Sequence, residues 1–402
     1  MRIATLLLAV LCAVVAADAV PARAQTSGTN DVKTVVVVMR HGVRSPTHPD
    51  ELQPYARDKW PAWEVKPGYL TPHGALLVQQ LGTFYRRTYA NVLGASGCPA
   101  KGDVFVWADV DERTVKSGES LIKGLAPGCG ITVGHAPADP DTLFDPLPSI
   151  AKANPGESMA SLMGSIGNDP AQLNAAYASQ FATIDTVLGC TRGACKTVSS
   201  VPTAVDSKGD DGLAGINGGM DMAADVAENM LLEYTDNKPV VGWGRVDHAR
   251  LLTMLQLHVI NKKIEHGGYA ARAHVSNILS HVLDMLHSDT HKAYFIVGHD
   301  TQLAEFAGIL HLSWLVRGDA MNDTPPGSAL LYELHAPASG AQYVRVYFVA
   351  QSLDDMRAGR GTNPQRVPVY VPGCPSFDCP VDTFSNVVNA AIDPKFVGTW
   401  NP

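Results

Sequence analysis

Three short segments of the chain combine cationic side chains with histidine and one carboxylic acid. The first is RHGVR at residues 40–44, the second carries Arg113, and the third is the pair His299 and Asp300. Guanidinium groups bind phosphate oxygens in pairs, an imidazole nitrogen can attack phosphorus, and a carboxylic acid can protonate a leaving alkoxide. Together these residue types could transfer a phosphoryl group.

Each segment follows a stretch that is typical of a buried strand. Residues 35–39, 103–108 and 293–297 are apolar runs without alternation, as expected for strands buried on both faces. In open α/β sheets, ligands bind outside the carboxyl ends of the strands. We therefore expect the three segments to meet at one edge of a sheet.

The remaining pattern predicts an α/β fold with a mixed central sheet flanked by helices. Two more strands are expected, and helical spacing recurs between the strands; Thr71 suits an N-cap and Pro72 the first helical position. Residues 149–244 differ in being rich in Ala, Met, Gly and Ser with helical spacing. They are expected to form a smaller inserted α-helical domain, whereas residues 25–148 and 245–402 form the α/β domain.

The first residues have the pattern of a secretory signal. Arg2 precedes an apolar run too short to span a bilayer, and Ala22, Arg23 and Ala24 fit a signal-peptidase site. Residues 1–24 are therefore expected to be removed, which places the protein in the periplasm or outside the cell. No later stretch is apolar enough to suggest a membrane span.

The cysteines fit such a destination. Six of the seven cysteines follow the signal, an even number for an oxidising compartment. Spacing favours pairing Cys190 with Cys195 and Cys374 with Cys379, and elimination then pairs Cys98 with Cys129. A metal site is the alternative, but neither short spacing is a CxxC knuckle.

Composition and charge exclude several classes of protein. The chain has 402 residues, 46% of them hydrophobic and 17% charged, which excludes disorder and suits large buried cores. Its formal net charge of −8 argues against nucleic acid as a partner. A small anionic substrate needs a local cluster of cations to overcome this charge. We expect a monomer without membrane contact.

The motifs resemble those of a known family. Residues 40–47, RHGVRSPT, resemble the RHGxRxP signature of the histidine acid phosphatases, and residues 298–301, GHDT, resemble their HD motif. Residues 109–114, DVDERT, match the family's arginine segment. Similarity to the bacterial phytase branch extends to residues 61–63, 70–72 and 322–327.

The resemblance implies a phosphoglycerate-mutase-like fold and a role for each motif residue. His41 would be the nucleophile that becomes phosphohistidine, and Asp300 would protonate the leaving group and then help to activate water. Neither a metal nor a cofactor is implied. The transferred phosphate would be held by Arg40, Arg44, Arg113 and His299.

Two of these residues also have ordinary structural explanations. Arg113, in a first helical turn, can pair with Asp111 or Glu112. Asp300 can cap the helix that begins at Thr301. Neither role excludes the catalytic one.

Substrate choice depends on weaker signals. The phytase branch has Thr-Lys after its signature, whereas this chain has Thr47 and His48, a cation only at acid pH. Glu228 and Arg272 lie where that branch has other pocket residues, although both also suit exposed helix faces. The resemblance to the phytase branch keeps inositol hexakisphosphate (phytate) as the preferred substrate, and other phosphomonoesters stay open.

Other functions remain as alternatives. A glucose-1-phosphatase-like or broad acid phosphatase would use the same motifs. A periplasmic anion-binding protein would need the arginines, but neither His41 nor Asp300. A mutase-like transferase shares the RHG element, but its metabolism is cytoplasmic, which the signal disfavours.

Overall fold

The structure is a computed structural model that describes residues 31–190, 193, 195–208, 211–400 and 402. The predicted signal at residues 1–24 lies outside these described residues. Within them, no helix has the length and apolarity that crossing a bilayer requires.

The elements alternate along most of the chain. The strands are β1 (Val32–Arg40), β2 (Val104–Ala108), β3 (Thr203–Lys208), β4 (Leu213–Gly218), β5 (Ala293–Gly298), β6 (Ala329–His335), β7 (Tyr343–Ala350), β8 (Gln365–Val369) and β9 (Cys379–Pro380). The helices are α1 (Pro72–Thr88), α2 (Ala90–Leu93), α3 (Glu112–Leu125), α4 (Pro155–Ser165), α5 (Ala171–Ala176), α6 (Ala178–Leu188), α7 (Gly219–Thr235), α8 (His248–Glu265), α9 (Gly268–His287), α10 (Asp300–Leu310), α11 (Leu353–Arg357) and α12 (Val381–Ala391).

The main sheet is mixed, which confirms the predicted fold class. Its strand order in the described part of the chain is β2-β5-β1-β6-β7-β8, with β9 beside β7. β1, β2 and β5 run parallel, whereas β6, β7 and β8 continue the sheet in antiparallel pairs. β1 therefore lies between two strands from the C-terminal half of the chain, and its carboxyl end is at the same edge as those of β2 and β5.

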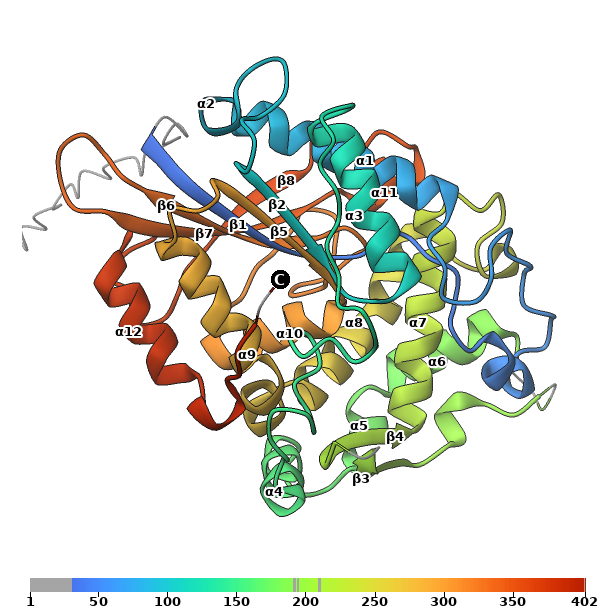
Figure 1. Ribbon diagram of the computed structural model, residues 1–402. Coiled ribbons are helices and arrows are strands. Elements are labelled where there is room, and N and C mark those ends of the chain that lie inside the picture. Colours follow the sequence, from blue (N-terminus) through green and yellow to red (C-terminus); the bar gives the residue numbers. More distant parts are fainter. Residues whose placement is uncertain (1–30, 191–192, 194, 209–210, 401) are drawn as a thin grey trace, which may run out of the picture.

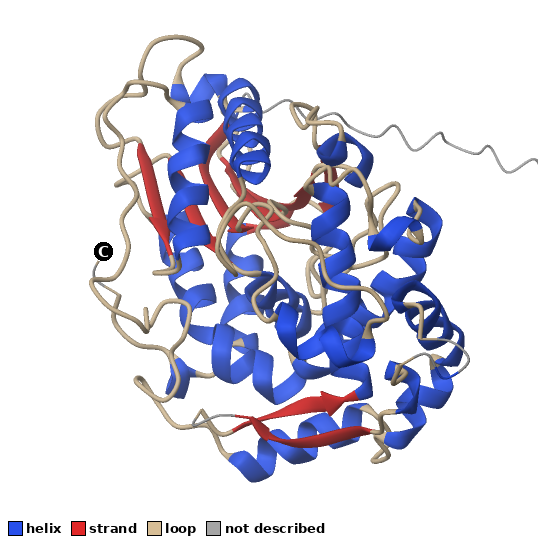
Figure 2. Cartoon of the chain, turned by 90° about the vertical axis from the view of Figure 1, so that its right-hand side faces the viewer, coloured by secondary structure: helices blue, strands red, loops and turns tan. Residues whose placement is uncertain are grey.

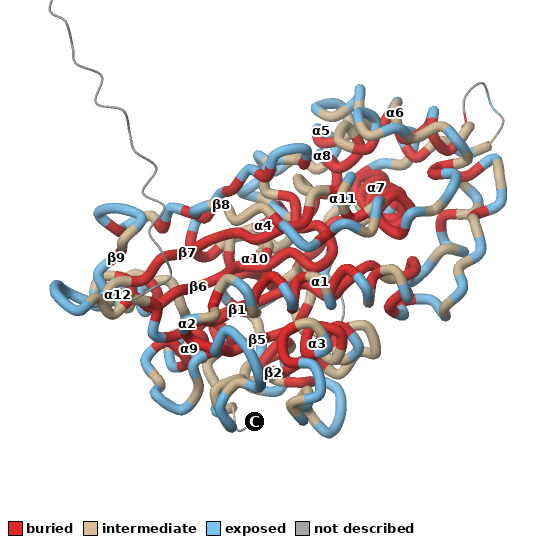
Figure 3. The backbone as a smooth tube through the Cα atoms, turned by 90° about the horizontal axis from the view of Figure 1, so that it is seen from above, coloured by how far each residue is buried: buried red, intermediate tan, exposed pale blue. Residues whose placement is uncertain are grey.

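Helices cover both faces of this sheet, which is why residues 35–39 of β1 are all apolar. Val36 and Val38 pack into the core with α9, α10 and α12, whereas Val35 and Val37 pack into the core with α1 and α3. Figure 1 shows the two helix layers on opposite sides of the sheet. In Figure 3 the central strands are buried over almost their whole length. Because successive side chains of a strand point to opposite faces, a continuous β-branched run fits only this environment.

The segment predicted as a helical insertion also contains strands. β3 and β4 pair as an antiparallel hairpin, which Figure 2 shows apart from the main sheet. The sequence analysis did not predict this hairpin, because the pattern of apolar and polar residues in this Gly-rich stretch does not distinguish short strands from helix. Helix α8 shares its apolar core with α4, α6 and α7. The division at residues 148 and 244 stays a prediction.

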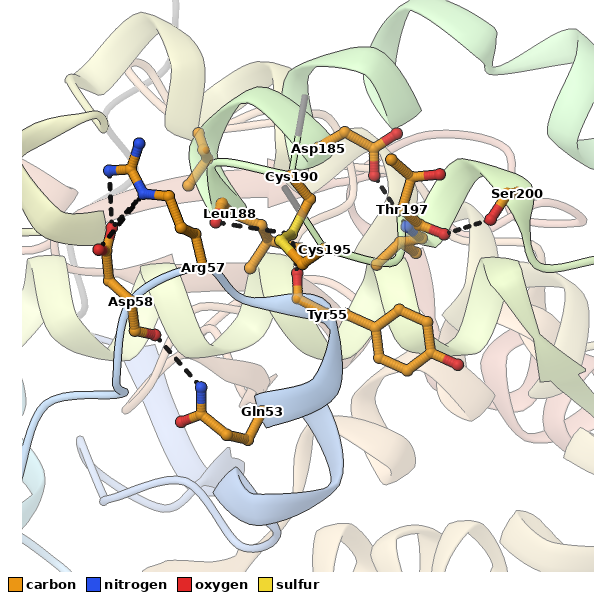
Figure 4. Close-up of a disulfide and its surroundings, with 12 residues drawn as sticks. Gln53, Tyr55, Arg57, Asp58, Asp185, Leu188, Cys190, Cys195, Thr197 and Ser200 are labelled. Atoms are coloured by element: carbon orange, nitrogen blue, oxygen red, sulfur yellow. Dashed lines mark hydrogen bonds and ion pairs between the residues drawn. A yellow bond between two sulfur atoms is a disulfide. The ribbon is translucent and has the colours of Figure 1, made fainter. Parts of the chain in front are cut away.

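Disulfides join the described cysteines in the predicted pairs, Cys98–Cys129, Cys190–Cys195 and Cys374–Cys379. Cys190–Cys195 closes a short loop after α6 (Figure 4). The N-terminal segment contacts this region, since the Arg57 backbone N donates to the Leu188 carbonyl over 2.9 Å. The Cys190–Cys195 disulfide thus lies where the end of α6 contacts the loop around Arg57.

Two glycines bring α1 and α3 into backbone contact. A Cβ atom at Gly124 would lie 1.8 Å from the Gln79 carbonyl oxygen, and one at Gly82 would lie 2.1 Å from the Leu121 carbonyl oxygen. The helices can approach this closely only because both positions lack a side chain. The contact fixes α3, which carries Arg113, against α1.

Gly124→Ala is therefore expected to destabilise the protein. The added methyl group must separate α1 from α3, which costs about 1–3 kcal/mol of unfolding free energy. Gly164→Ala in α4 is the matched control, because nothing lies within 4 Å of its Cβ position. Urea denaturation measures both; equal stability of the two variants would contradict the close helix contact.

Candidate active site

The three predicted segments meet at one edge of the main sheet. In the parallel register, Arg40 of β1 pairs with Gly298 of β5, and Ala108 of β2 pairs with Val297. The backbone N of His41 donates to the Gly298 carbonyl over 2.9 Å, and that of Asp109 donates to Val297 over 3.0 Å. The chain therefore leaves all three strands at the same level, as expected from the sequence.

His41 is buried, and its ring has a defined orientation. Only 2% of the residue is exposed. Its Nδ1 lies 2.8 Å from the Gly42 carbonyl oxygen. A carbonyl can only accept, so Nδ1 carries the proton and Nε2 keeps its lone pair. The ring also makes an edge contact with that of His299, with centroids 5.5 Å apart.

The loop after β1 is held tightly against α1 and α3. The Gly42 backbone N donates to Ser117 Oγ over 2.9 Å. A Cβ at Gly42 would lie 2.6 Å from a Val78 methyl, and a Cβ at Gly74 would lie 2.2 Å from the Val43 carbonyl oxygen. Glycine at both positions lets the loop pack onto the start of α1, where Thr71 caps the helix as predicted by accepting from the Gly74 backbone N. This packing fixes the backbone that orients His41.

Arg40, Arg44 and Arg113 supply the positive charge around His41. Arg40 is fully buried, and its NH1 donates to the Thr324 carbonyl over 2.6 Å. Each of the three arginines also has a buried Nε–H that donates to no acceptor in the described part of the chain. Unpaired buried donors are costly unless an anion accepts them, so the three guanidinium groups suit a phosphate.

These charges determine the protonation state of His41. Burial, together with the positive charges of Arg40, Arg113 and Arg44, lowers the pKa of His41 well below its usual value. The imidazole therefore stays neutral in acid, where an exposed histidine would be protonated. A neutral ring with a free Nε2 is the form that can act as a nucleophile.

Asp300 lies among three cations. Its Oδ2 is 3.4 Å from Lys262 Nζ, 3.5 Å from His258 Nε2 and 3.7 Å from an Arg40 nitrogen. Burial alone would raise the pKa of Asp300, but Lys262, Arg40 and His258 together hold it well below the usual value. The free protein therefore carries Asp300 as a carboxylate. Asp300 is the first residue of α10 and follows the N-cap His299; its Oδ1 accepts from the Thr301 backbone N over 3.0 Å, so it also satisfies a donor at the helix start.

A second layer of charged residues balances this cluster. Glu228 of α7 is buried, accepts from Arg40, and lies 3.4 Å from Arg44. Burial alone would raise the pKa of Glu228, but Arg40, His258 and Arg44 lower it, so it is ionised. Burial would lower the pKa of His258, but Asp300, Asp323 and Glu228 raise it to about 9. Glu228 therefore neutralises the arginines in the free protein, rather than lying on an exposed helix face.

His299 and Arg113 form the other side of the cluster. His299 Nε2 donates to Asp109 Oδ2 over 2.7 Å, and Arg113 NH2 lies 3.4 Å from His299 Nδ1. Arg113 also pairs with Asp111 over 2.6 Å, which is the alternative noted from the sequence. The structure thus places Arg113 in both settings, beside Asp111 and beside His299.

The predicted substrate residues divide into two groups. Thr47 is exposed at the rim, where a Cβ on Gly68 would contact both Thr47 and Arg113; His48 is exposed beside it. Arg272 is exposed on α9, and no hydrogen bond or ion pair joins its side chain to the described residues of the cluster. The assignment of Arg272 to substrate binding stays a prediction.

His274, two residues after Arg272, does reach the site. It lines a cavity of about 250 Å³ together with Asp109, Asp111 and His299. Its Nδ1 lies 2.8 Å from Glu305, and its Nε2 lies 3.2 Å from Asp145. Burial would lower the pKa of His274, but the two carboxylates raise it to about 10. His274 therefore adds a positive charge to this cavity.

Sequence reasoning missed several residues of this cluster. Asp109 could have been found, because it directly follows a strand. His258 and Lys262 have no local motif, although their spacing of four places them on one helix face. The residues missed are Asp109, His258, Lys262, His274 and Asp323.

Two groups of side chains are close enough to share a metal ion, Asp109 with Asp111 and His299, and Glu228 with His258 and Asp300. In each group the carboxylates already pair with cations of the chain. Arg113 pairs with Asp111, and Arg40 pairs with Glu228. Their positive charge disfavours a further cation, and the donors are better suited to balancing the arginines.

Comparisons with known proteins show the family to which the chain belongs. The family model of the histidine phosphatase superfamily (branch 2) matches residues 31–161. The phytase AppA of Escherichia coli K12 is 32% identical over 408 residues, which cover 92% of this chain and 94% of the relative. The chain belongs to the histidine phosphatase superfamily, branch 2. The prediction of a histidine acid phosphatase is thereby confirmed.

Other similar proteins are a glucose-1-phosphatase and two phytases of known structure. A glucose-1-phosphatase of Providencia rettgeri is 24% identical and covers 92% of this chain and 93% of its own. The phytase of Hafnia alvei superposes with a TM-score of 0.86 at 29% identity, covering 92% of this chain and 98% of its own. The Citrobacter braakii phytase gives the same TM-score at 28% identity, with coverages of 92% and 100%.

Asp109→Asn tests the orientation of His299. The amide keeps the size of the side chain but replaces the charged acceptor of the His299 Nε2 proton with a neutral one, which orients the ring less firmly. Misplacing one phosphate ligand by about 1 Å costs about 10²-fold in rate, so kcat/KM for phosphate esters should fall to a similar degree. Steady-state kinetics measures the loss, with circular dichroism as the folding control. Unchanged kinetics would mean that Asp109 does not position His299.

Proposed function

We propose that this protein hydrolyses phosphate monoesters through a phosphohistidine on His41, and that phytate is its preferred substrate. The observation that carries the proposal is a neutral, buried imidazole with Nε2 free among three arginines that retain unpaired donors. A phosphate bound by these arginines would lie beside an imidazole whose Nε2 stays unprotonated at acid pH and can attack phosphorus.

The first chemical step transfers the phosphoryl group. His41 Nε2 forms a bond to phosphorus while the ester P–O bond breaks, and Asp300 gives its proton to the leaving alkoxide. Arg40, Arg44 and Arg113 neutralise the charge on the equatorial oxygens. In the second step Asp300 takes a proton from water, whose oxygen attacks phosphorus and frees His41 and inorganic phosphate.

Asp300 must be protonated to act as the acid, whereas the free protein holds it ionised. A bound phosphate supplies negative charge to the arginines that otherwise stabilise the Asp300 carboxylate, which raises the pKa of Asp300 in the complex. The rate of the first step should therefore fall as pH rises through this higher value. His41 stays neutral across the same range, because its own pKa is lowered.

Similarity supports the choice of phytate. Relatives named phytases reach 32% identity to this chain, against 25% for those named glucose-1-phosphatases. The Hafnia alvei phytase was solved in complex with myo-inositol hexakis sulphate, and this chain superposes on that structure with a TM-score of 0.84. The cationic residues around the site suit a polyanion.

Export is part of the proposal. The signal pattern at residues 1–24 and the disulfides among the described cysteines support a periplasmic or secreted enzyme.

Rapid quenching during turnover tests the nucleophile. With ³²P-labelled substrate, acid-labile and base-stable label is expected on His41 of the wild-type protein. His41→Ala should lose label and at least ~10⁴-fold of kcat, because the covalent route is gone, while keeping its circular dichroism spectrum. A variant that retains substantial activity, or label trapped on another residue, would overturn the assignment.

Asp300→Asn tests the proton donor and the substrate together. The amide cannot protonate a leaving group, so kcat on phytate and glucose 1-phosphate should fall about 10²–10⁴-fold, and far less on p-nitrophenyl phosphate. The fall in wild-type rate between acid and neutral pH should disappear in the variant. Equal losses on all three substrates, or a wild-type profile flat to pH 8, would assign Asp300 a positioning role instead. A wild-type preference for glucose 1-phosphate over phytate would overturn the substrate assignment.

A further inference from the structure

Lys262 is a cation in contact with the proposed proton donor. It lies on α8, one turn after His258, and its Nζ is 3.4 Å from Asp300 Oδ2. No motif marks this lysine, and the mechanism proposed above does not use it. Lys262 therefore lies beside the carboxyl group that protonates the leaving group in the proposed mechanism.

The three cations at Asp300 differ in how firmly they are held. Arg40 is fully buried and also pairs with Glu228, and the His258 side chain is 4% exposed and also pairs with Asp323. The Lys262 side chain is 24% exposed. Within the described residues, its ammonium forms an ion pair with Asp300 alone. A bound ligand can therefore reach Lys262 most readily.

The surroundings of Lys262 leave it room to move. Its side chain lines a cavity of about 500 Å³ between α8 and α10, together with Ala304 and Gly308. Lysine carries its charge on a flexible four-carbon stem, so the ammonium can change partners at little steric cost. The exposed Asp225 of α7 also faces this ammonium.

The charges facing Asp300 come from every element packed around it. Arg40 follows from β1, Glu228 from α7, and His258 and Lys262 from α8, with Asp323 behind His258. The buried members of this set are already paired with one another. Lys262 is therefore the cation whose movement away from Asp300 would most change the positive charge around this carboxylate.

We propose that Lys262 determines specificity for polyphosphorylated substrates by leaving Asp300 to bind a second phosphate on the leaving group. This inference rests on the proposed function, because it requires Asp300 to be the proton donor. A substrate with a neighbouring phosphate offers the ammonium a dianion in place of a monoanionic carboxylate. A monophosphate offers none, so Lys262 stays paired with Asp300.

The exchange has a chemical consequence for the acid. When Lys262 leaves, Asp300 loses an ion-pair partner and gains a phosphate nearby, so it takes up a proton from solvent more readily. Asp300 thereby becomes protonated when a polyphosphorylated substrate is bound. With a monophosphate, Asp300 remains largely ionised and protonates the leaving group less often.

Lys262→Met separates the two effects of the lysine. The variant removes the charge and keeps an unbranched side chain, and Lys263→Met, at an exposed neighbour on α8, is the matched control. The substrates are phytate and myo-inositol 1-phosphate, which share a ring and differ in the number of phosphates. Initial rates are measured from pH 3 to 8 for both, and Lys262→Arg serves as the conservative rescue.

We expect opposite responses to the two substrates. Lys262→Met should lower kcat/KM for phytate about tenfold, because a phosphate contact is lost. On myo-inositol 1-phosphate it should cause no loss, and the pH at which the rate falls should rise by about one unit, because Asp300 is no longer held ionised by Lys262. Lys262→Arg should retain the wild-type preference, and Lys263→Met should behave as wild type on both substrates.

Failure of the inference differs from failure of the proposed function. If the wild type hydrolyses both substrates and Lys262→Met changes both equally, or neither, Lys262 has no part in specificity. A wild type that hydrolyses the monophosphate but not phytate also overturns the inference, since no second phosphate is then recognised. If the wild type releases phosphate from neither ester, the proposed function itself is wrong.

Discussion

Burial of positive charge around one neutral imidazole is the constraint on which this site depends. Arg40 is enclosed completely, and Arg44 and Arg113 lie close enough to keep His41 unprotonated. Isolated buried guanidinium groups are costly, so the fold must supply carboxylates that neutralise them without occupying the phosphate position. Glu228 and Asp300 meet that need, and both come from helices outside the signature motif.

This balance links substrate binding to proton transfer. In the proposed mechanism, guanidinium groups that bind the phosphate also stabilise the Asp300 carboxylate, so binding of the phosphate weakens the electrostatic stabilisation of that carboxylate. A protein that only bound phosphate would gain nothing from a carboxylate here, since it would repel the ligand. The competition is useful only when the carboxyl group must accept a proton once the ligand is present.

Much of the fold and the motif residues could be predicted from the sequence, because they are encoded locally. The apolar run of β1, the Thr71 cap and the strand ends before His41, Asp109 and His299 are read from neighbouring residues. The β3–β4 hairpin was missed, because short strands in a Gly-rich stretch have no distinct period.

The charged residues that complete the site could not be predicted in the same way. His258 and Lys262 lie about 220 residues after His41 and meet the cluster only through the packing of α8. His274 was missed for a related reason, because the sequence alone does not show which face of α9 lines a cavity. Spacing identifies a helix face, whereas packing determines what that face meets.

The place of β1 in the sheet has a consequence for biosynthesis. The strand that leads to His41, the proposed nucleophile, is made well before both of its neighbours, because β5 and β6 belong to the last third of the chain. Most of the polypeptide is therefore synthesised before β1 can pair with another strand of the sheet. Until then its valine-rich segment is exposed and prone to aggregate. Contacts so distant in sequence slow folding, so the site is complete only at the end of folding.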